Sequence, residues 1–283
     1  MPIRRWGMAL VLLVGAASGC SPTETETPSK RPQEIAVPEP DPQVRQLTIP
    51  FDAYNFSPAE DMTLDVAEDV VVRDCMNARG LAWQALPGPG ESEIEPPHRR
   101  RYGVIESRVA DVFGYHAPPY RPAVAARGVK ALARVTGAPP GVREAAKACL
   151  KQARASMYGG AQKADAAFFN KVIFATFDAA QRDRRVTRAF RSWSACMAEE
   201  GFRYADPLAA ITDRRWSTKA PTTQEIRTAQ RDVLCKEKTG VVSIWAAAET
   251  RVQNAAIRAH PGKFRELRAV KVRQLAAARR VLG

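Results

Sequence analysis

Four cysteines in the body of the chain are the residues whose type and number point most directly to a chemistry. The sequence contains five cysteines, and those after Cys20 are Cys75, Cys149, Cys196 and Cys235. An even number of cysteines in an exported chain indicates disulfide bonds. A zinc site would instead need clustered spacings such as Cys-x-x-Cys, which the sequence does not contain. We therefore predict two disulfides, with no metal site and no cofactor.

A repeated pattern around these cysteines suggests how they pair. Residues 75–83 read Cys-Met-x-x-x-Gly-Leu-x-Trp, and residues 196–204 read Cys-Met-x-x-x-Gly-Phe-x-Tyr. Each copy is followed by a cysteine on a later predicted helix, which favours Cys75–Cys149 and Cys196–Cys235. A pairing of Cys75 with Cys235 or Cys196 stays open, because a pseudo-symmetric packing of the two Cys-Met helices would produce it. A duplicated unit explains the pattern, and so do two disulfide-linked helix pairs that arose independently; the sequence favours neither.

Three residues in an irregular segment are the candidates for acid-base chemistry. Residues 87–122 are rich in proline and glycine and contain Glu106, Asp111 and His116. Carboxylates and an imidazole that converge on one pocket could act as general acid and base. The sequence shows no nucleophile elbow, phosphate-binding loop or dinucleotide fingerprint. We therefore assign no catalytic residue and expect a non-enzymatic protein. The alternative is a hydrolase that acts on envelope material, with its site in residues 87–122.

The first twenty residues have the features of an export signal. Arg4 and Arg5 precede an uncharged, largely apolar stretch from residue 6 to residue 17. The stretch is shorter than the roughly 20 residues that a membrane span needs, but it has the length of a secretory h-region. It ends in the sequence Ala-Ser-Gly-Cys at residues 17–20.

Small residues followed directly by cysteine resemble the lipobox of bacterial lipoproteins. The resemblance implies that residues 1–19 are a lipoprotein signal peptide and that Cys20 is acylated and becomes the mature N-terminus. The protein would then be held on the extracytoplasmic face of the cell membrane by its lipid. An ordinary signal peptide, cleaved after Ala17 or Gly19, is the alternative.

Residues 20–50 are predicted to form a disordered tether. They are rich in Pro, Thr and Glu and poor in apolar residues, as flexible linkers are. We place a helical extracytoplasmic domain at residues 51–283. It divides into sub-units 51–160 and 161–283 if the repeat is a true duplication.

The body is predicted to be all-α, a disulfide-clamped helical bundle with long C-terminal helices. Hydrophobic residues make up 45% and charged residues 26% of the chain, which excludes a wholly disordered protein. Ser57 and Thr222 each begin a capping box, Asp183 interrupts a long helical region, and Gly240 weakens a helix that continues to about residue 259. Helices are expected at about residues 58–79, 106–113, 123 onward, 142–155, 163–200, 207 onward, 223–259 and 262–281.

Two charge patterns accompany these helices. Asp61, Asp65 and Asp69 follow one another at four-residue spacing, and we expect this stripe to pair with arginines rather than to bind a cation. The chain carries a net charge of +13, and arginines crowd residues 182–191 and 265–280. An exported protein rarely meets nucleic acid, so the expected partners of this surface are anionic lipid headgroups or cell-wall polymers. Ordinary solvated helix faces are the alternative.

The second Cys-Met segment also carries a family resemblance. Together with Asp232-x-x-Cys235-Lys236-x-x-Thr239-Gly240, it resembles uncharacterised secreted lipoproteins of high-GC Gram-positive bacteria. The resemblance covers mainly residues 186–258 and the lipobox, and it implies location and fold but no activity. We therefore expect a lipid-anchored extracytoplasmic protein that is a binding or structural module at the cell envelope.

Overall fold

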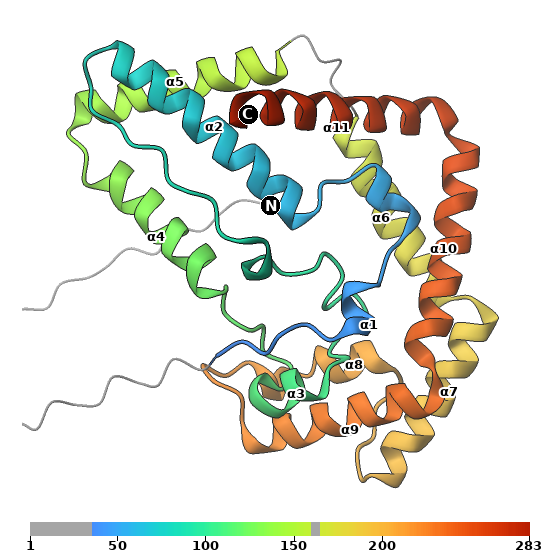
Figure 1. The fold of residues 1–283 in the computed structure, drawn as a ribbon. Coiled ribbons are helices and arrows are strands. Elements are labelled where there is room, and N and C mark those ends of the chain that lie inside the picture. The colour runs from blue at the N-terminus through green and yellow to red at the C-terminus, as the bar shows by residue number, and fades with distance from the viewer. Residues whose placement is uncertain (1–35, 160–164) are drawn as a thin grey trace, which may run out of the picture. The chain divides into compact units, whose positions relative to one another are not determined.

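The computed structural model describes residues 36–159 and 165–283, which are all-α and contain no strand (Figure 1). The predicted fold class is therefore confirmed. The described α-helices are α1 (Pro42–Arg45), α2 (Pro58–Ala78), α3 (Ser107–Phe113), α4 (Pro122–Thr136), α5 (Pro140–Tyr158), α6 (Ala166–Gln181), α7 (Arg184–Glu199), α8 (Pro207–Ile211), α9 (Thr223–Thr239), α10 (Val241–Ala259) and α11 (Pro261–Leu282). Short 3-10 helices are η1 (Pro50–Ala53), η2 (Glu91–Glu93) and η3 (Arg214–Trp216). Among the described helices, none combines the length and apolar character of a membrane crossing.

Capping residues begin helices where the sequence predicts them. The Ser57 hydroxyl accepts a hydrogen bond from the Glu60 amide at 3.2 Å, and the Glu60 carboxylate accepts one from the Ser57 amide at 2.8 Å. Thr222 begins α9 with the same reciprocal pair. Asp183 caps α7 and separates it from α6, as expected. These caps satisfy amide groups that have no partner inside their own helix.

The expectation of one helix over residues 223–259 was wrong. Gly240 adopts φ +62°, the left-handed conformation that ends α9, and α10 starts at the next residue. Glycine reaches this conformation at little cost because it has no Cβ. The residue that we expected to weaken a helix therefore divides it in two.

The folded body starts before the boundary that we placed at residue 50. Val44 on α1 is fully buried among core residues of the C-terminal helices, and Ile49 is buried in a second cluster with Phe51. Residues 37–283 form one compact unit. The signal peptide, Cys20 and the first part of the predicted tether lie outside the described residues.

The larger hydrophobic core lies among α3, α7, α9 and α10. Trp193 of α7 and Trp245 of α10 are its largest fully buried side chains. The Trp245 ring contacts Tyr102, Phe177 and Phe190, with ring centroids 5.1, 5.3 and 5.1 Å away. Aromatic contacts of this kind add to the free energy gained by apolar burial. Tyr102, Val104 and Ile105 of the irregular segment belong to this core, which fixes the course of the chain there.

Helices α2, α5 and α11 form the second packing group. Val72, Met76 and Trp83 lie against buried residues of α5 in a small cluster. Helix α11 packs on α2 and α5, so it joins the first half of the chain although it follows the second (Figure 1). The two proposed sub-units are therefore not separate packing units in the described residues.

Both predicted disulfides are present. Cys75 bonds to Cys149 between α2 and α5, and Cys196 bonds to Cys235 between α7 and α9, each with 5.7 Å between the Cα atoms. Each disulfide stands one turn before a helix end with the same hydrogen bonds. Met76 and Met197 offer their carbonyl oxygens to the amides of Leu81 and Phe202, at 3.1 and 2.8 Å. Gly80 and Gly201 have φ of +73° and +87°, which these ends require.

Candidate functional site

The three predicted acid-base candidates do not converge in the structure. Glu106 is buried and pairs with Arg99 at 2.7 Å. Asp111 is exposed and accepts a hydrogen bond from Gln230 at 2.8 Å. His116 contacts Glu225, on a different element again. Each side chain has its own partner, so the three do not form one acid-base centre.

Both ring nitrogens of His116 are occupied by hydrogen-bond partners. Nδ1 lies 2.7 Å from the Glu225 carboxylate, and Nε2 lies 2.8 Å from the Thr218 carbonyl oxygen. The hydrogen bond to Thr218, followed by that to Glu225, raises the pKa of His116 above its ordinary value. Both neighbours are acceptors and therefore favour the doubly protonated ring. In this geometry His116 holds its loop in place and offers no free nitrogen to act as a base.

Glu225 joins that loop to the start of α9. Its carboxylate is fully buried and accepts hydrogen bonds from the amides of Tyr115 and His116, at 2.8 and 3.0 Å. Gly114 makes the approach possible, because a Cβ there would lie 2.9 Å from the Glu225 side chain. Glu225 is also the third residue of the capping box that Thr222 begins, so one carboxylate performs both roles.

The arginine run at residues 99–101 sends each guanidinium to a different place. Arg99 binds Glu106 and Glu95, and Arg101 binds the fully buried Glu249 of α10. Arg100 donates to the carbonyl oxygens of Tyr115 and His116, at 2.7 and 3.2 Å. The run is therefore mainly an internal anchor for the irregular segment.

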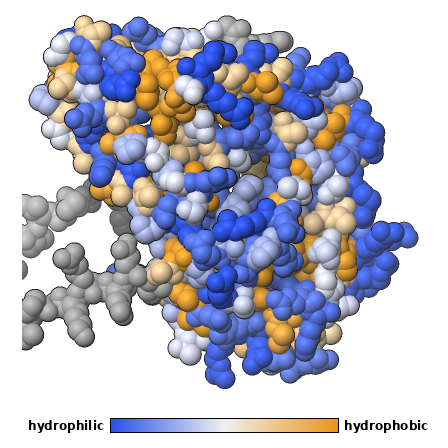
Figure 2. All heavy atoms as spheres, in the orientation of Figure 1, coloured by the Kyte–Doolittle hydropathy of each residue, from blue (hydrophilic) through white to orange (hydrophobic). Residues whose placement is uncertain are grey.

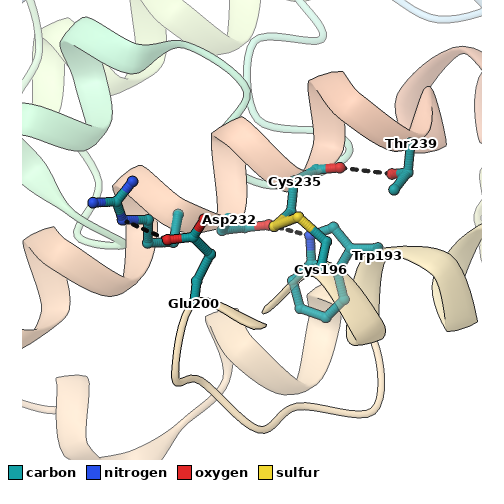
Figure 3. The surroundings of a disulfide bond; sticks show 7 residues. Trp193, Cys196, Glu200, Asp232, Cys235 and Thr239 are labelled. Carbon is teal, nitrogen blue, oxygen red and sulfur yellow. Dashed lines mark hydrogen bonds and ion pairs between the residues drawn. A yellow bond between two sulfur atoms is a disulfide. The ribbon is translucent and has the colours of Figure 1, made fainter. Parts of the chain in front are cut away.

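A buried ion pair supports the same segment from α9. Lys236 lies 2.8 Å from Asp232 and donates a second hydrogen bond to the Val104 carbonyl oxygen at 2.8 Å. The indole of Trp193 donates to Asp232 at 2.9 Å, beside the Cys196–Cys235 disulfide (Figure 3). Burial raises the pKa of Asp232 and lowers that of Lys236. A buried ion pair needs further hydrogen bonds to offset the loss of hydration, and here the Trp193 indole and the Val104 carbonyl oxygen supply two of them.

An apolar pocket opens in the segment that these anchors hold. Its volume is about 250 Å³, and apolar side chains make up most of its wall. Its lining residues come from α3 and from the irregular segments on both sides of it, and they are Glu95, Pro96, Pro97, Arg99, Arg100, Val104, Ile105, Glu106, Val109, Ala117, Pro118, Pro119 and Tyr120. The pocket lies where we predicted a site, but of the three candidate residues only Glu106 lines it.

Arg100 is the cation of this pocket that has no carboxylate partner. Glu95 and Glu106 pair with Arg99, and Glu95 also pairs with Arg121 at 2.7 Å. Among the described residues, no carboxylate lies within ion-pair distance of Arg100. Burial lowers the pKa of Arg100, because removing a cation from water is costly. An anionic group in the pocket would lower that cost.

Two helix faces carry the expected basic surface. On α7 and just before it, five arginines are exposed: Arg182, Arg184, Arg185, Arg188 and Arg191. On α11 the exposed arginines are Arg265, Arg268, Arg273, Arg279 and Arg280. Among the described residues, none of these ten is in an ion pair. Lys271 belongs to the same predicted group but turns inward and pairs with Glu60 at 2.8 Å.

Two of the three aspartates in the stripe of α2 pair with arginines, as the sequence predicts, whereas Asp61 is in no ion pair among the described residues. Asp65 lies 2.7 Å from Arg127, and Asp69 lies 2.6 Å from Arg134. Both arginines belong to α4, so this stripe attaches α4 to α2. In the described part of the chain, no group of three or more histidine, cysteine or carboxylate side chains is placed to hold a metal ion.

Sequence reasoning assigned no structural role to four residues that build this region, although two of them belong to the quoted motif: Asp232, Lys236, Glu249 and Gln253. All four are buried, on α9 and α10. The signal that could have identified them is a charged or amide residue on the apolar face of a helix at i, i+4 spacing.

No family model matches the chain, and neither a curated protein nor a solved structure shows significant similarity to it.

Proposed function

We propose that this protein is a lipid-anchored, extracytoplasmic binding module of the cell envelope, without enzymatic activity. The resemblance of residues 17–20 to a lipobox supports the anchor at Cys20. The two disulfides support an oxidising location, because such bonds persist mainly in exported proteins. The commitment of both His116 nitrogens weighs against the alternative of a hydrolase with its site in residues 87–122.

The observation that carries the proposal is the apolar pocket beside Arg100. Its acidic residues are neutralised by neighbouring arginines, whereas Arg100 hydrogen-bonds only carbonyl oxygens in the described structure. Binding sites for small molecules are typically apolar cavities with a few polar groups that orient the ligand. The pocket therefore suits a small, mainly apolar molecule with one anionic group.

A binding experiment with two matched probes tests this site. Octanoate and octanol share an alkyl chain, but only octanoate is anionic. We expect the protein to bind octanoate more tightly, and Arg100→Gln to weaken octanoate binding by roughly tenfold while leaving octanol unchanged. Arg108→Gln is the control, because Arg108 is exposed, pairs with Asp41 and lies outside the pocket lining. Equal affinity for the two probes would remove Arg100 from the proposal.

The anchor is tested separately in the protein's own host. We expect the intact mass of the mature protein to begin at Cys20 and to include fatty acyl chains. Cys20→Ala should release the protein from the membrane fraction, because each buried methylene of a lipid chain contributes about 0.8 kcal/mol to membrane binding. A secreted form that begins at another residue would contradict the anchor.

The arginine face of α7 supports a second binding surface. Arg184, Arg188 and Arg191 follow one another over about 10 Å at 1.5 Å per residue, which suits a polymer with repeated anionic groups. We propose an anionic cell-wall polymer as its partner. Binding of this kind should fade as salt rises, since the Debye length is only about 10 Å at 0.1 M. Binding that persists unchanged at 0.5 M salt would contradict an electrostatic surface.

A further inference from the structure

Helix α4 shows its apolar side to the solvent. Val129, Leu132 and Val135 recur every three residues along one face and are 68%, 66% and 43% exposed. Tyr120, just before the helix, is 77% exposed. A surface helix of a globular domain ordinarily turns its apolar stripe toward the core. Helix α4 does the opposite.

The polar side of α4 is the side that attaches it to the body. Arg127 is buried and binds Asp65 together with the carbonyl oxygens of Leu86 and Pro87. One face of the helix is therefore held by guanidinium groups.

Arg134 makes the second attachment, two turns further along. It binds Asp69 at 2.6 Å, and its guanidinium lies 4.3 Å from the centre of the Trp83 ring. Because both arginines point inward from the same side of the helix, the orientation of α4 is fixed by charge, and the apolar strip is left outside.

The tether enters the folded body at the N-terminal end of α4. Arg121, the residue before α4, donates hydrogen bonds to the Pro38 carbonyl oxygen at 3.1 Å and to Glu39 at 2.6 Å. The chain between Cys20 and this point, residues 21–36, could span about 50 Å at most, at roughly 3 Å per residue. A lipid on Cys20 would therefore keep α4 within reach of the bilayer.

The charges of α4 also suit a lipid surface. The helix contains no acidic residue, and Lys130 is its exposed cation, because Arg127 and Arg134 face the body and pair with Asp65 and Asp69. Lys130 is exposed about 100° around the helix from Val129, at the flank between the strip and the attached side, and Arg143 is exposed at the start of α5. Amphipathic helices that lie in the membrane interface combine an apolar strip with flanking cations, and tyrosine is enriched at the same depth.

We propose that the outward strip of α4, together with Tyr120, docks on the bilayer to which the chain is anchored. Val129, Leu132 and Val135 would enter the boundary between headgroups and acyl chains, with Lys130 at the headgroups. The inference rests on the proposed lipid anchor for its place in the cell, but the surface itself is measurable without the acyl group.

Co-sedimentation with vesicles tests the surface on the mature chain with Cys20→Ser, which keeps the tether and lacks the lipid. Vesicles contain phosphatidylglycerol and phosphatidylcholine. We expect the double variant Val129→Ser, Leu132→Ser to bind the vesicles with a partition coefficient about tenfold lower than that of the parent. Phe174→Ser on α6 is the matched control, since Phe174 is 71% exposed and lies on another helix. It should bind as the parent does.

A second variant keeps the test decisive if the double variant unfolds. Leu132→Trp places an indole on the strip, and brominated lipids should quench its fluorescence on docking. Equal binding of parent and α4 variants, or no quenching, would overturn the inference. So would a dimer of the parent that the α4 substitutions dissociate, because the strip would then be an interface between copies. If the unacylated chain docks but Cys20 carries no lipid in the host, the surface stands and the proposed anchor fails.

Discussion

The two disulfide clamps share one frame but are lined by different chemistry. In the first clamp, the residues three before each cysteine are Val72 and Ala146, both in an apolar cluster. In the second clamp the equivalent positions hold Trp193 and Asp232, which hydrogen-bond to each other. The same crossing of two helices therefore accommodates either an apolar contact or a buried polar network.

The difference lies in what each clamp holds besides its own helices. Lys236 follows Cys235 and extends from Asp232 to the carbonyl oxygen of Val104 in the irregular segment. Leu150, the residue after Cys149, packs only in the local apolar cluster. Gly103 makes the contact of Lys236 possible, because a Cβ there would lie 2.8 Å from the ammonium nitrogen. The second clamp therefore positions the pocket segment, whereas the first stabilises a helix pair.

Breaking the polar network should have the largest effect. We expect Lys236→Met to lower the free energy of unfolding by about 3–5 kcal/mol, because it leaves Asp232 buried without its counter-charge. Leu150→Met at the equivalent position of the first clamp should cost less than about 1.5 kcal/mol. Urea unfolding of both variants measures the difference. Equal costs would mean that the network contributes nothing beyond ordinary packing.

Removing the disulfides should affect the two clamps almost equally. The bonds close loops with sequence separations of 74 and 39. In the chain-entropy model each contributes about 4 kcal/mol, with a difference of well under 1 kcal/mol. Paired Cys→Ala substitutions, Cys75 with Cys149 and Cys196 with Cys235, measure this by thermal and urea unfolding. A cost far larger at the second clamp would show that burial, not loop length, decides it.

A smaller effect is expected at the contact between α4 and the first clamp. Arg134→Gln removes the pair with Asp69 and the contact with the Trp83 ring, which should cost about 1–2 kcal/mol. Arg154→Gln is the control, because Arg154 is exposed in its pair with Glu68 and should change stability by less than about 1 kcal/mol. Similar values for the two variants would show that the Trp83 contact adds nothing.

The smallest effect is a pH dependence of stability at the His116 loop, which Glu225 of α9 holds. Because the folded-state pKa of His116 is raised, its stabilising contribution is complete below the unfolded pKa of about 6.5. The contribution is lost as the pH rises through the folded pKa. Unfolding of the parent and of His116→Gln between pH 5.5 and 8.5 should therefore converge toward the alkaline end. Parallel curves would contradict a protonated His116.

The sequence was informative where one local pattern determines the structure. The Cys-Met-x-x-x-Gly repeat predicted both disulfide pairs, since each glycine ends a helix at the same distance from its cysteine. The caps at Ser57 and Thr222 were predicted because a hydroxyl and a glutamate at three-residue spacing satisfy amides within one turn.

The sequence was uninformative where residues far apart in the chain determine the structure together. Glu249 binds Arg101 across 148 positions, and helical periodicity on α10 does not show which face meets that loop. Gly240 lies in an otherwise helical pattern, and only the packing of α9 against α10 requires its left-handed turn. The face in Figure 2 is mostly hydrophilic, with hydrophobic side chains in small separate groups. Which side chains reach this face likewise depends on how the helices pack, and the sequence does not show it. The pocket could be placed in residues 87–122, but its lining could not.

The position of α11 has a consequence for the order of folding. Phe264 and Leu267 of α11 bury Ile49 and Phe51, and Lys271 pairs with Glu60. These contacts join the earliest described residues to the latest helix, and contacts so distant in sequence form slowly. If the protein is exported as proposed, the chain that emerges from the export channel exposes the side of α2 that α11 covers until α11 itself has emerged. The Cys75–Cys149 bond, which needs nothing beyond α5, can hold α2 and α5 together during that wait and shorten the exposure to aggregation.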